Sequence, residues 1–556
     1  MRLVKNFIRG KDLFNLLGNP SLVNFLIVFL AVNISLLIKF NSFKFFSPVL
    51  FSDNAIYAIL TTRFISGDYQ NALHIWWQPL YPFLGSLIFN LTKNVLESLF
   101  LVSVISGSLL FVPIYFITKE LTKNLYFSLL AAFLSVFHPL LIRSYFSLLT
   151  ENLFIFLEMV FIMFSLLTLT RKRWYFASLA GVSGGLAYLC RNDILLPLQL
   201  YLLMLILFTL FKKIEFKFTL KAITFCLISF IIIISPYLLF NYQRFSYLNL
   251  SAKINAAGNT PAYFSPQNNF TSTFAQDVWS IDTPNYDSHY FNVPLNYYKY
   301  RVIIYEAFLV KMASYIKLIN TSTPQTILYL FFFGFFISLL YFAFKKPLFL
   351  ALHVFLILGV LLSVPFHPGV DFRYLYWIFP ILNIFLALAM FFITKFLVSF
   401  FKLFLKGSVT VSIVKFFFIV LINLALIVYL VNINKNTLTV PSEFTIFNQA
   451  PDQFKIVGSY IKSLSSSKPR VMTRREAFAY YADSITIYIP SSLEMQQLKD
   501  YAKLWKVNFI IADRFTFAPD TPLGILVYEE MAPDWLKVVK IWNFGFTKTI
   551  LYKVEL

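Results

Sequence analysis

The sequence is poor in charged residues and in cysteine. Only 13% of its 556 residues are charged and 58% are hydrophobic, whereas soluble proteins have about 25% charged and about 45–50% apolar residues. The two cysteines, Cys190 and Cys226, lie in apolar stretches, which gives no disulfide framework and no cysteine-based metal site. Because a soluble core cannot hold such an apolar surplus, we expect a polytopic α-helical membrane protein.

Motifs for nucleotides and metals are also missing. The chain has no Asp-x-Asp pair, no P-loop and no glycine-rich dinucleotide fingerprint, so nothing indicates a nucleotide-sugar donor. The five histidines lack metal-ligand spacing, and we expect no cofactor; a divalent ion held by Asp53 and other carboxylates is the open alternative. The net charge of +21 does not indicate a nucleic-acid partner, because cytoplasmic loops of membrane proteins collect Lys and Arg.

Long apolar runs predict about eleven transmembrane helices, since a bilayer core of about 30 Å needs about 20 apolar residues per helix. The runs lie near 21–38, 98–118, 125–142, 152–170, 174–190, 194–211, 218–240, 326–344, 348–366, 374–395 and 411–432. With eleven spans, the main clusters of Lys and Arg all fall on one side. The positive-inside rule then places the N-terminus in the cytoplasm.

Three long segments face outward in this arrangement. We predict a transmembrane domain over residues 1–432, with outer loops 39–97 and 241–325, and an extracytoplasmic α/β domain over 433–556. Short strand-like runs at 470–472, 508–511 and 549–554 support the second domain. Within it, Arg474 and Arg475 are expected to be solvated.

Ionisable residues gather at the predicted outer ends of the spans. They are Asp53, Asp68, Glu97, Glu151, Arg191, Asp193, Asp371 and Arg373. Several of them could instead have structural roles. Asp53, at the start of a short interfacial helix over 53–66, and Glu151 could each cap a helix. Arg191 and Asp193 could form an ion pair, and Arg373 could anchor the chain at the membrane surface. Charges near membrane depth are costly, so their convergence on one face indicates a functional site.

Short motifs follow one another in a characteristic order. They are Asp53 with Tyr57, Gly67-Asp68-Tyr69, Gln78-Pro79-Leu80-Tyr81-Pro82, Thr150-Glu151, the Gly184–Arg191 run and Phe372-Arg373-Tyr374. In their order, spacing and sidedness, the chain resembles the membrane-embedded GT-C glycosyltransferases that use polyprenyl-phosphate sugars. The resemblance is closest to bacterial relatives of the protein O-mannosyltransferases and of the lipid A aminoarabinose transferase.

The chain departs from these enzymes at three points. Asn54 follows Asp53 where many of them have Glu, which puts in doubt any role that needs a second carboxylate at this position. Arg191 stands where the aminoarabinose transferases have Lys. The Trp-Trp-Asp motif of oligosaccharyltransferases is absent from the C-terminal segment, which disfavours transfer of a whole oligosaccharide.

The resemblance implies inverting transfer of a sugar from a polyprenyl-phosphate donor to a hydroxyl or other nucleophile. The acceptor would be a lipid, glycan or protein at the outer face of the cytoplasmic (inner) membrane. Because a phosphate leaves as an anion, one base and positive charge on the phosphate suffice. We expect Asp53 as the base and Arg191 and Arg373 as phosphate ligands. Glu151 is expected to position Arg191 or the acceptor. The remaining substrate-site candidates are Asp68, Tyr57 and Tyr374.

Two other classes of function remain as alternatives. A flippase or transporter of lipid-linked sugars predicts polar residues through the middle of the bilayer, where Glu158 is the sole candidate. A non-catalytic envelope assembly protein predicts that Asp53, Arg191 and Arg373 can be replaced without loss of function.

Overall fold

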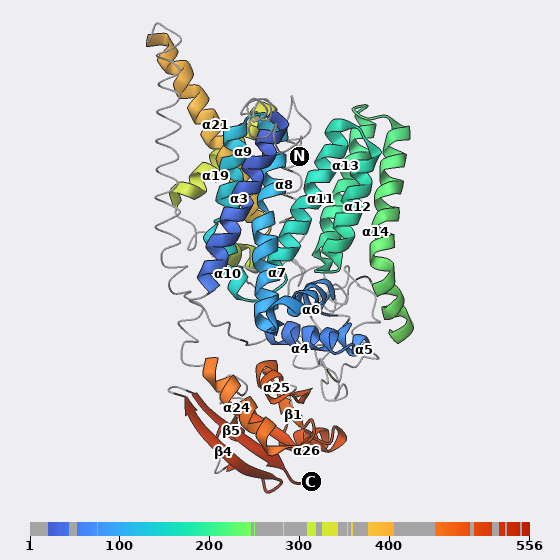
Figure 1. The fold of residues 1–556 in the computed structure, drawn as a ribbon, viewed down its shortest axis with the longest axis vertical. Helices are drawn as coiled ribbons and strands as arrows, with labels where there is room; N and C mark the ends of the chain where they lie inside the picture. Colours follow the sequence, from blue (N-terminus) through green and yellow to red (C-terminus); the bar gives the residue numbers. More distant parts are fainter. Residues whose placement is uncertain are drawn as a thin grey trace, which may run out of the picture.

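The structure is a computed structural model. It describes residues 20–43, 50, 53–74, 76–245, 250, 282, 309–317, 325–342, 353, 357, 359, 376–404, 451–489, 494–513, 517, 522–528, 531–544 and 547–556. These residues form a helical bundle with a separate five-stranded sheet beyond one end of it (Figure 1).

Apolar helices make up the bundle. In chain order they are α3 (Pro20–Phe43), α6 (Leu80–Thr92), α7 (Val95–Leu109), α8 (Phe111–Thr122), α9 (Leu125–Val136), α10 (Pro139–Phe146), α11 (Glu151–Arg171), α12 (Trp174–Tyr188), α13 (Leu195–Leu210), α14 (Phe216–Phe245), α19 (Gln325–Phe342) and α21 (Ile378–Phe404). Among the described residues, six stretches are long and apolar enough to cross a membrane: Asn24–Asn41, Val95–Thr122, Glu151–Arg171, Asn192–Leu210, Phe216–Gln243 and Ile378–Phe400. The prediction of a multi-pass helical membrane protein is therefore confirmed.

The predicted count of eleven spans stays a prediction. The run at 125–142 is divided between α9 and α10, and the run at 174–190 forms α12, which has 15 residues. The spans predicted at 348–366 and 411–432 lie wholly or almost wholly outside the described residues, as does the predicted domain boundary at 432. Short helices such as α12 are packed between longer ones, so hydropathy alone does not give their length.

The tripeptide Thr-Lys-Asn forms two of the tight turns between helices. Lys93 ends α6 and Lys123 ends α8, each with φ of 55°. The asparagine that follows then caps the next helix: the Asn94 side chain accepts hydrogen bonds from the first turn of α7, and Asn124 does the same for α9. An asparagine side chain satisfies backbone N–H groups that have no partner within the helix. The chain can therefore reverse direction within two residues.

Glycines allow α12 to pack closely against α14. A Cβ atom at Gly181 would lie 2.1 Å from the backbone oxygen of Cys226, and one at Gly185 would lie 2.7 Å from the Cβ of Ile233. Small residues at helix contacts let the backbones approach, which strengthens packing in a membrane. The Gly-Gly pair of the 184–191 run therefore includes a packing position.

The Gly181→Ala variant is expected to lose about 1–3 kcal/mol of stability, because its methyl group meets rigid backbone. Gly184→Ala is the matched control, since its Cβ would meet side-chain rings and no backbone, with Phe161 at 3.1 Å and Phe230 at 3.5 Å. Thermal unfolding of both variants in detergent measures the difference. Equal midpoints for the two variants would contradict a tight backbone contact at Gly181.

Two short helices lie at the end of the bundle that faces the sheet (Figure 1). They are α4 (Asp53–Ile65) and α5 (Tyr69–Ala72). The helix predicted over 53–66 is thus confirmed, and it begins at Asp53. Its buried residues pack against α6 and α7, which fixes α4 to the bundle.

The C-terminal part has a mixed sheet with the strand order β2-β1-β3-β5-β4. The strands are β1 (Arg470–Thr473), β2 (Ile485–Tyr488), β3 (Phe509–Asp513), β4 (Leu536–Phe544) and β5 (Thr547–Val554); β1 is parallel to β2 and β3, and β5 is antiparallel to β3 and β4. Helices α24 (Pro451–Leu464), α25 (Glu476–Ala482) and α26 (Met495–Leu504), with a short 3-10 turn η5 (Gly524–Val527), complete it. The predicted small α/β region is confirmed.

Side chains of the sheet alternate between two apolar cores. Val471, Phe509 and Ile511 pack in the same core as Phe454 of α24 and Phe478 of α25. Their neighbours along the strands pack in the second core, which also contains residues of α26 and η5. Examples are Met472, Ile510, Ala512 and Tyr552. This alternation is the period-2 pattern expected of strands. Helix α25 also contacts α4, so the first core faces the bundle.

Candidate active site

Helix α4 places Asp53 and Tyr57 at the end of the bundle that faces the sheet. Asp53 is the first helical residue and is partly exposed, whereas Tyr57, one turn later, is buried. The Tyr57 ring packs edge-on against Tyr81, with 5.5 Å between ring centroids. Because Tyr81 also bonds the carbonyl of Leu99 at 3.0 Å, the position of Tyr57 is set by α6 and α7.

Arg191 lies buried between two carboxylates. Its Nη1 lies 3.0 Å from Oε1 of Glu151, and its Nη2 lies 2.7 Å from Oδ2 of Asp193. The side chains of Arg191 and Glu151 are 9% and 4% exposed, whereas that of Asp193 is 33% exposed. The Arg191–Asp193 ion pair, one of the two roles left open by the sequence, is present, and Glu151 joins it from the start of α11.

Electrostatic interactions connect Tyr57 with Asp53 and with the ion pair of Glu151 and Arg191. Burial raises the pKa of Tyr57, the charges of Asp53 and Glu151 raise it further, and Arg191 lowers it. Charges act in this way over short distances. Asp53, Glu151 and Arg191, which three segments of the chain supply, therefore all act electrostatically on Tyr57.

The Gln78–Pro82 motif is tied to the segment that follows Arg191. Nε2 of Gln78 donates to Oδ1 of Asn192 at 2.7 Å in a buried position, and the amide of Leu80 donates to the Leu189 carbonyl at 2.9 Å. These bonds hold the start of α6 against the short turn η1 (Asn192–Ile194). They fix Arg191 relative to the segment that carries α4 and α5, and neither was predicted from the sequence.

Asp68 is placed apart from this group. It caps α5, where its side chain accepts a hydrogen bond from the Asn71 amide. It follows the far end of α4, a helix about 18 Å long at 1.5 Å per residue. The structure adds no support for the predicted substrate role of Asp68, because capping α5 already explains the hydrogen bond of its side chain.

The other two predicted substrate residues, Arg373 and Tyr374, lie outside the described residues. Within the described part of the chain, no group of three or more His, Cys, Asp and Glu side chains could hold a metal ion. Glu151 and Asp193 instead share an ion pair with the single guanidinium of Arg191. A divalent ion at Asp53 would therefore need ligands other than Glu151 and Asp193.

The C-terminal part supplies charged residues that the sequence did not point to. Glu476 begins α25 and is only 5% exposed, and α25 packs against α4. Arg474 and Arg475, expected to be solvated, are partly buried, and the Arg474 guanidinium lies 5.7 Å from the centroid of the Tyr488 ring. Glu476 is more than 400 residues from Asp53, so spacing gave no signal for their proximity.

Asp282 bridges α4 and the sheet. One carboxylate oxygen pairs with the Arg63 guanidinium of α4, and the other accepts the backbone N–H of Thr486 in β2 at 2.6 Å. Both side chains of the ion pair are about 15% exposed or less. Because charged hydrogen bonds are the strong ones, Asp282 helps to hold the sheet against α4.

Asp282→Asn is expected to weaken this link by about 1–3 kcal/mol, since it removes the charge from both bonds. Hydrogen exchange of the Thr486 amide should become faster in the variant. Asp500→Asn is the control, because Asp500 is exposed on α26 and bonds only within that helix among the interactions described. Unchanged exchange at Thr486 in Asp282→Asn would contradict the bridge.

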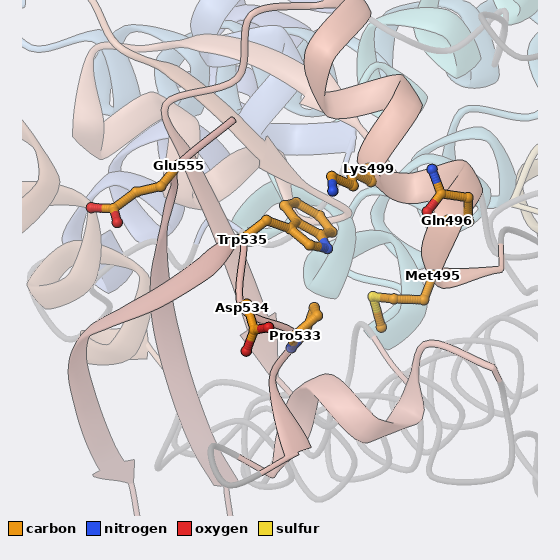
Figure 2. Close-up of a pocket in the computed structure, with 7 residues that line it drawn as sticks. All are labelled: Met495, Gln496, Lys499, Pro533, Asp534, Trp535 and Glu555. Atoms are coloured by element: carbon orange, nitrogen blue, oxygen red, sulfur yellow. The ribbon is translucent and has the colours of Figure 1, made fainter.

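A separate hollow of about 660 Å³ lies in the C-terminal part. It is lined by Met495, Gln496, Lys499, Pro533, Asp534, Trp535 and Glu555 (Figure 2). None of these residues belongs to the group around Tyr57. The hollow is therefore a feature of the sheet region and is distinct from the candidate active site.

The fold is that of the GT-C glycosyltransferases. The chain is similar to ArnT from Cupriavidus metallidurans bound to undecaprenyl phosphate, with a TM-score of 0.56 and 14% identity over 94% of this chain and 97% of that one. The apo state of the same protein gives a TM-score of 0.57 and 13% identity over the same shares. An oligosaccharyltransferase from Archaeoglobus fulgidus gives a TM-score of 0.53 and 13% identity over 88% of this chain and 69% of that one.

The sequence itself gives a family match. Residues 78–240 match the dolichyl-phosphate-mannose-protein mannosyltransferase family. This segment includes the Gln78–Pro82 motif, Glu151 and Arg191. No curated protein matches the chain. The predicted resemblance to GT-C glycosyltransferases is confirmed by the family match and by the fold.

Proposed function

We propose that the protein transfers a sugar from a polyprenyl-phosphate donor to a nucleophile on a lipid, glycan or protein acceptor, with inversion. The family match and the GT-C fold support lipid-linked sugar transfer. The observation that carries the proposed site is the grouping of Asp53, Tyr57, Glu151 and Arg191 at one end of an apolar bundle. The flippase and assembly-protein alternatives have no comparable support.

The site lies in the cytoplasmic membrane, at its outer face, in this proposal. The basic residues of the helix connections favour a cytoplasmic N-terminus, and α4 and the sheet lie together at the opposite end of the first span (Figure 1). A lipid-anchored phosphate can reach this end from within the bilayer, while the acceptor approaches from the aqueous side. The structure of ArnT bound to undecaprenyl phosphate supports a polyprenyl phosphate as the lipid partner.

Each residue has a defined chemical task. Asp53 takes the proton of the acceptor hydroxyl as the oxygen attacks the anomeric carbon, and the bond to the phosphate oxygen breaks on the opposite face. The polyprenyl phosphate then leaves as an anion, next to the positive charge of Arg191. Glu151 and Asp193 hold the guanidinium plane in place. The proposed residue for a second positive charge is Arg373.

Sugar transfer from radiolabelled polyprenyl-phosphate donors tests this function directly. Membranes that contain the protein are compared with membranes that lack it, with several donor sugars and a varied acceptor pool. Label that moves from donor to acceptor only in the presence of the protein supports the proposal. Flipping of the labelled donor without transfer would favour a flippase instead.

A further inference from the structure

The hollow of about 660 Å³ in the C-terminal part has no task in the proposed transfer chemistry. Helix α26 supplies one wall, and the segment before β4 and the residue after β5 supply the other. Figure 2 shows the indole of Trp535 in the middle of the lining residues, with Lys499 on the α26 side and Asp534 and Glu555 on the other. The volume lies in the usual range for small-ligand sites, about 300–1,000 Å³.

Backbone hydrogen bonds fix the wall that carries Trp535. The amide of Leu536 donates to the Pro533 carbonyl at 2.8 Å. This bond closes a tight turn with Asp534 and Trp535 at its centre. The amide of Glu555 donates to the Trp535 carbonyl at 3.0 Å, which ties the end of the sheet to the turn. The indole itself belongs to the second core and is only 9% exposed, so this wall is in place before a ligand binds.

A capping box fixes the opposite wall at the first turn of α26. The Glu494 side chain accepts the backbone N–H of Gln497, and the Gln497 side chain accepts that of Glu494 at 2.9 Å. These bonds satisfy backbone groups that a helix start leaves without a partner. Leu498 of the same turn is buried in the second core, whereas Gln496 and Lys499 line the hollow. Both walls are therefore set by local structure.

The lining offers hydrogen-bond donors and acceptors together. Lys499 donates, Asp534 and Glu555 accept, and the Gln496 amide does both. Among the described residues, no hydrogen bond or ion pair engages Lys499 or Asp534, so both can bind a ligand without losing an existing contact. Two carboxylates against one ammonium disfavour an anion, and charged groups around the indole disfavour a purely apolar ligand. The lining favours a neutral ligand that is rich in hydroxyl groups.

We propose that the hollow binds a glycan segment of the acceptor. This rests on the proposed function and names the class of acceptor. A sugar ring is neutral, its hydroxyl groups both donate and accept, and its C–H groups form an apolar face. The hydroxyl groups match Lys499 and Asp534, and the apolar face matches the exposed part of the Trp535 indole.

The position of the hollow decides which part of the acceptor it holds. Trp535 and α26 belong to the second core, whereas the first core lies on the other face of the sheet and faces the bundle. The bound segment is therefore remote from the reacting end, and the acceptor is a chain that extends past the sheet. A second point of attachment raises the effective concentration of such a chain at the transfer site.

Oligosaccharide binding to the full-length protein in detergent tests the hollow without any transfer. The probes are linear hexasaccharides of glucose, mannose and N-acetylglucosamine, and a glycine–serine peptide of similar length is the comparison. At least one hexasaccharide should bind more tightly than the peptide. Binding of no hexasaccharide, or equal binding of the peptide, would overturn the proposal.

Substitutions in the lining locate the bound hexasaccharide. Asp534→Ala and Lys499→Ala should each weaken its binding by about 10–100-fold, the effect of losing a hydrogen bond to a charged group. Both side chains are at least partly exposed, so the variants should fold. Lys503→Ala is the matched control, because Lys503 is exposed on the same helix and does not line the hollow. Equal effects of Lys499→Ala and Lys503→Ala would overturn the site.

Transfer kinetics separate the failure of this inference from the failure of the proposed function. With a polyprenyl-phosphate donor, Asp534→Ala should raise the KM for a long glycan acceptor by the same factor as it weakens binding, with the KM for the donor unchanged. Glycan binding at the hollow without transfer from any donor would overturn the function, and with it the acceptor role. Transfer with the same acceptor KM in Asp534→Ala, or transfer to lipid and peptide acceptors alone, would overturn this inference and leave the function standing.

Discussion

Asp53→Asn is expected to lower sugar transfer by about 10²–10⁴-fold, the usual effect of removing a general base. The substitution preserves the shape of the side chain and removes only the ability to take a proton. A helix-end role for Asp53 predicts a much smaller effect, because a carboxylate in the first turn contributes only about 0.3–1 kcal/mol to the helix. The size of the loss therefore separates the two roles.

The measurement is transfer of radiolabelled sugar by membranes that contain equal amounts of folded protein. Glu97→Gln is the matched control: Glu97 lies in the first turn of α7 and accepts a hydrogen bond from Asn94 at 3.4 Å. Its amide variant should transfer like the wild type. If Asp53→Asn transfers as fast as Glu97→Gln, Asp53 is not the base.

Features that depend on local sequence could be predicted. The sequence indicated a short helix from Asp53, which the structure contains, and it offered the pairing of Arg191 with Asp193 as one of two possible roles. Hydropathy located the long spans but not the division between α9 and α10, since a break near Pro139 leaves the composition apolar. Local patterns thus gave the elements and the nearest polar contacts.

Contacts between distant segments could not be predicted in the same way. Gln78 reaches Asn192 because the start of α6 lies against η1, a contact for which the sequence gave no signal. Glu476 and Asp282 contribute only once the C-terminal sheet is placed against α4. Their sequence surroundings resemble ordinary polar loops, so the information lies in the tertiary arrangement. This is why the C-terminal arginines were expected to be solvated.

Arg191→Gln is expected to cost about 3–5 kcal/mol of stability, because it leaves the buried Glu151 carboxylate without its cationic partner. Arg171→Gln is the matched control. Arg171 pairs with Glu120 at 2.8 Å at the other end of α11, but its side chain is 55% exposed, so the loss should be about 0–1 kcal/mol. Thermal unfolding in detergent measures both variants, and equal losses would contradict a buried pair.

The double variant Arg191→Gln with Glu151→Gln separates stability from donor binding. Removal of both charges should recover much of the stability, because no buried charge is then left alone. If Arg191 also contacts the donor phosphate, the KM for the donor should still rise by about 10–100-fold, since charged hydrogen bonds contribute about 1.5–3 kcal/mol. A stable double variant with the donor KM of the wild type would show that Arg191 only holds α11 and α12 together. The phosphate would then need a cation from elsewhere in the chain, for which Arg373 is the remaining candidate.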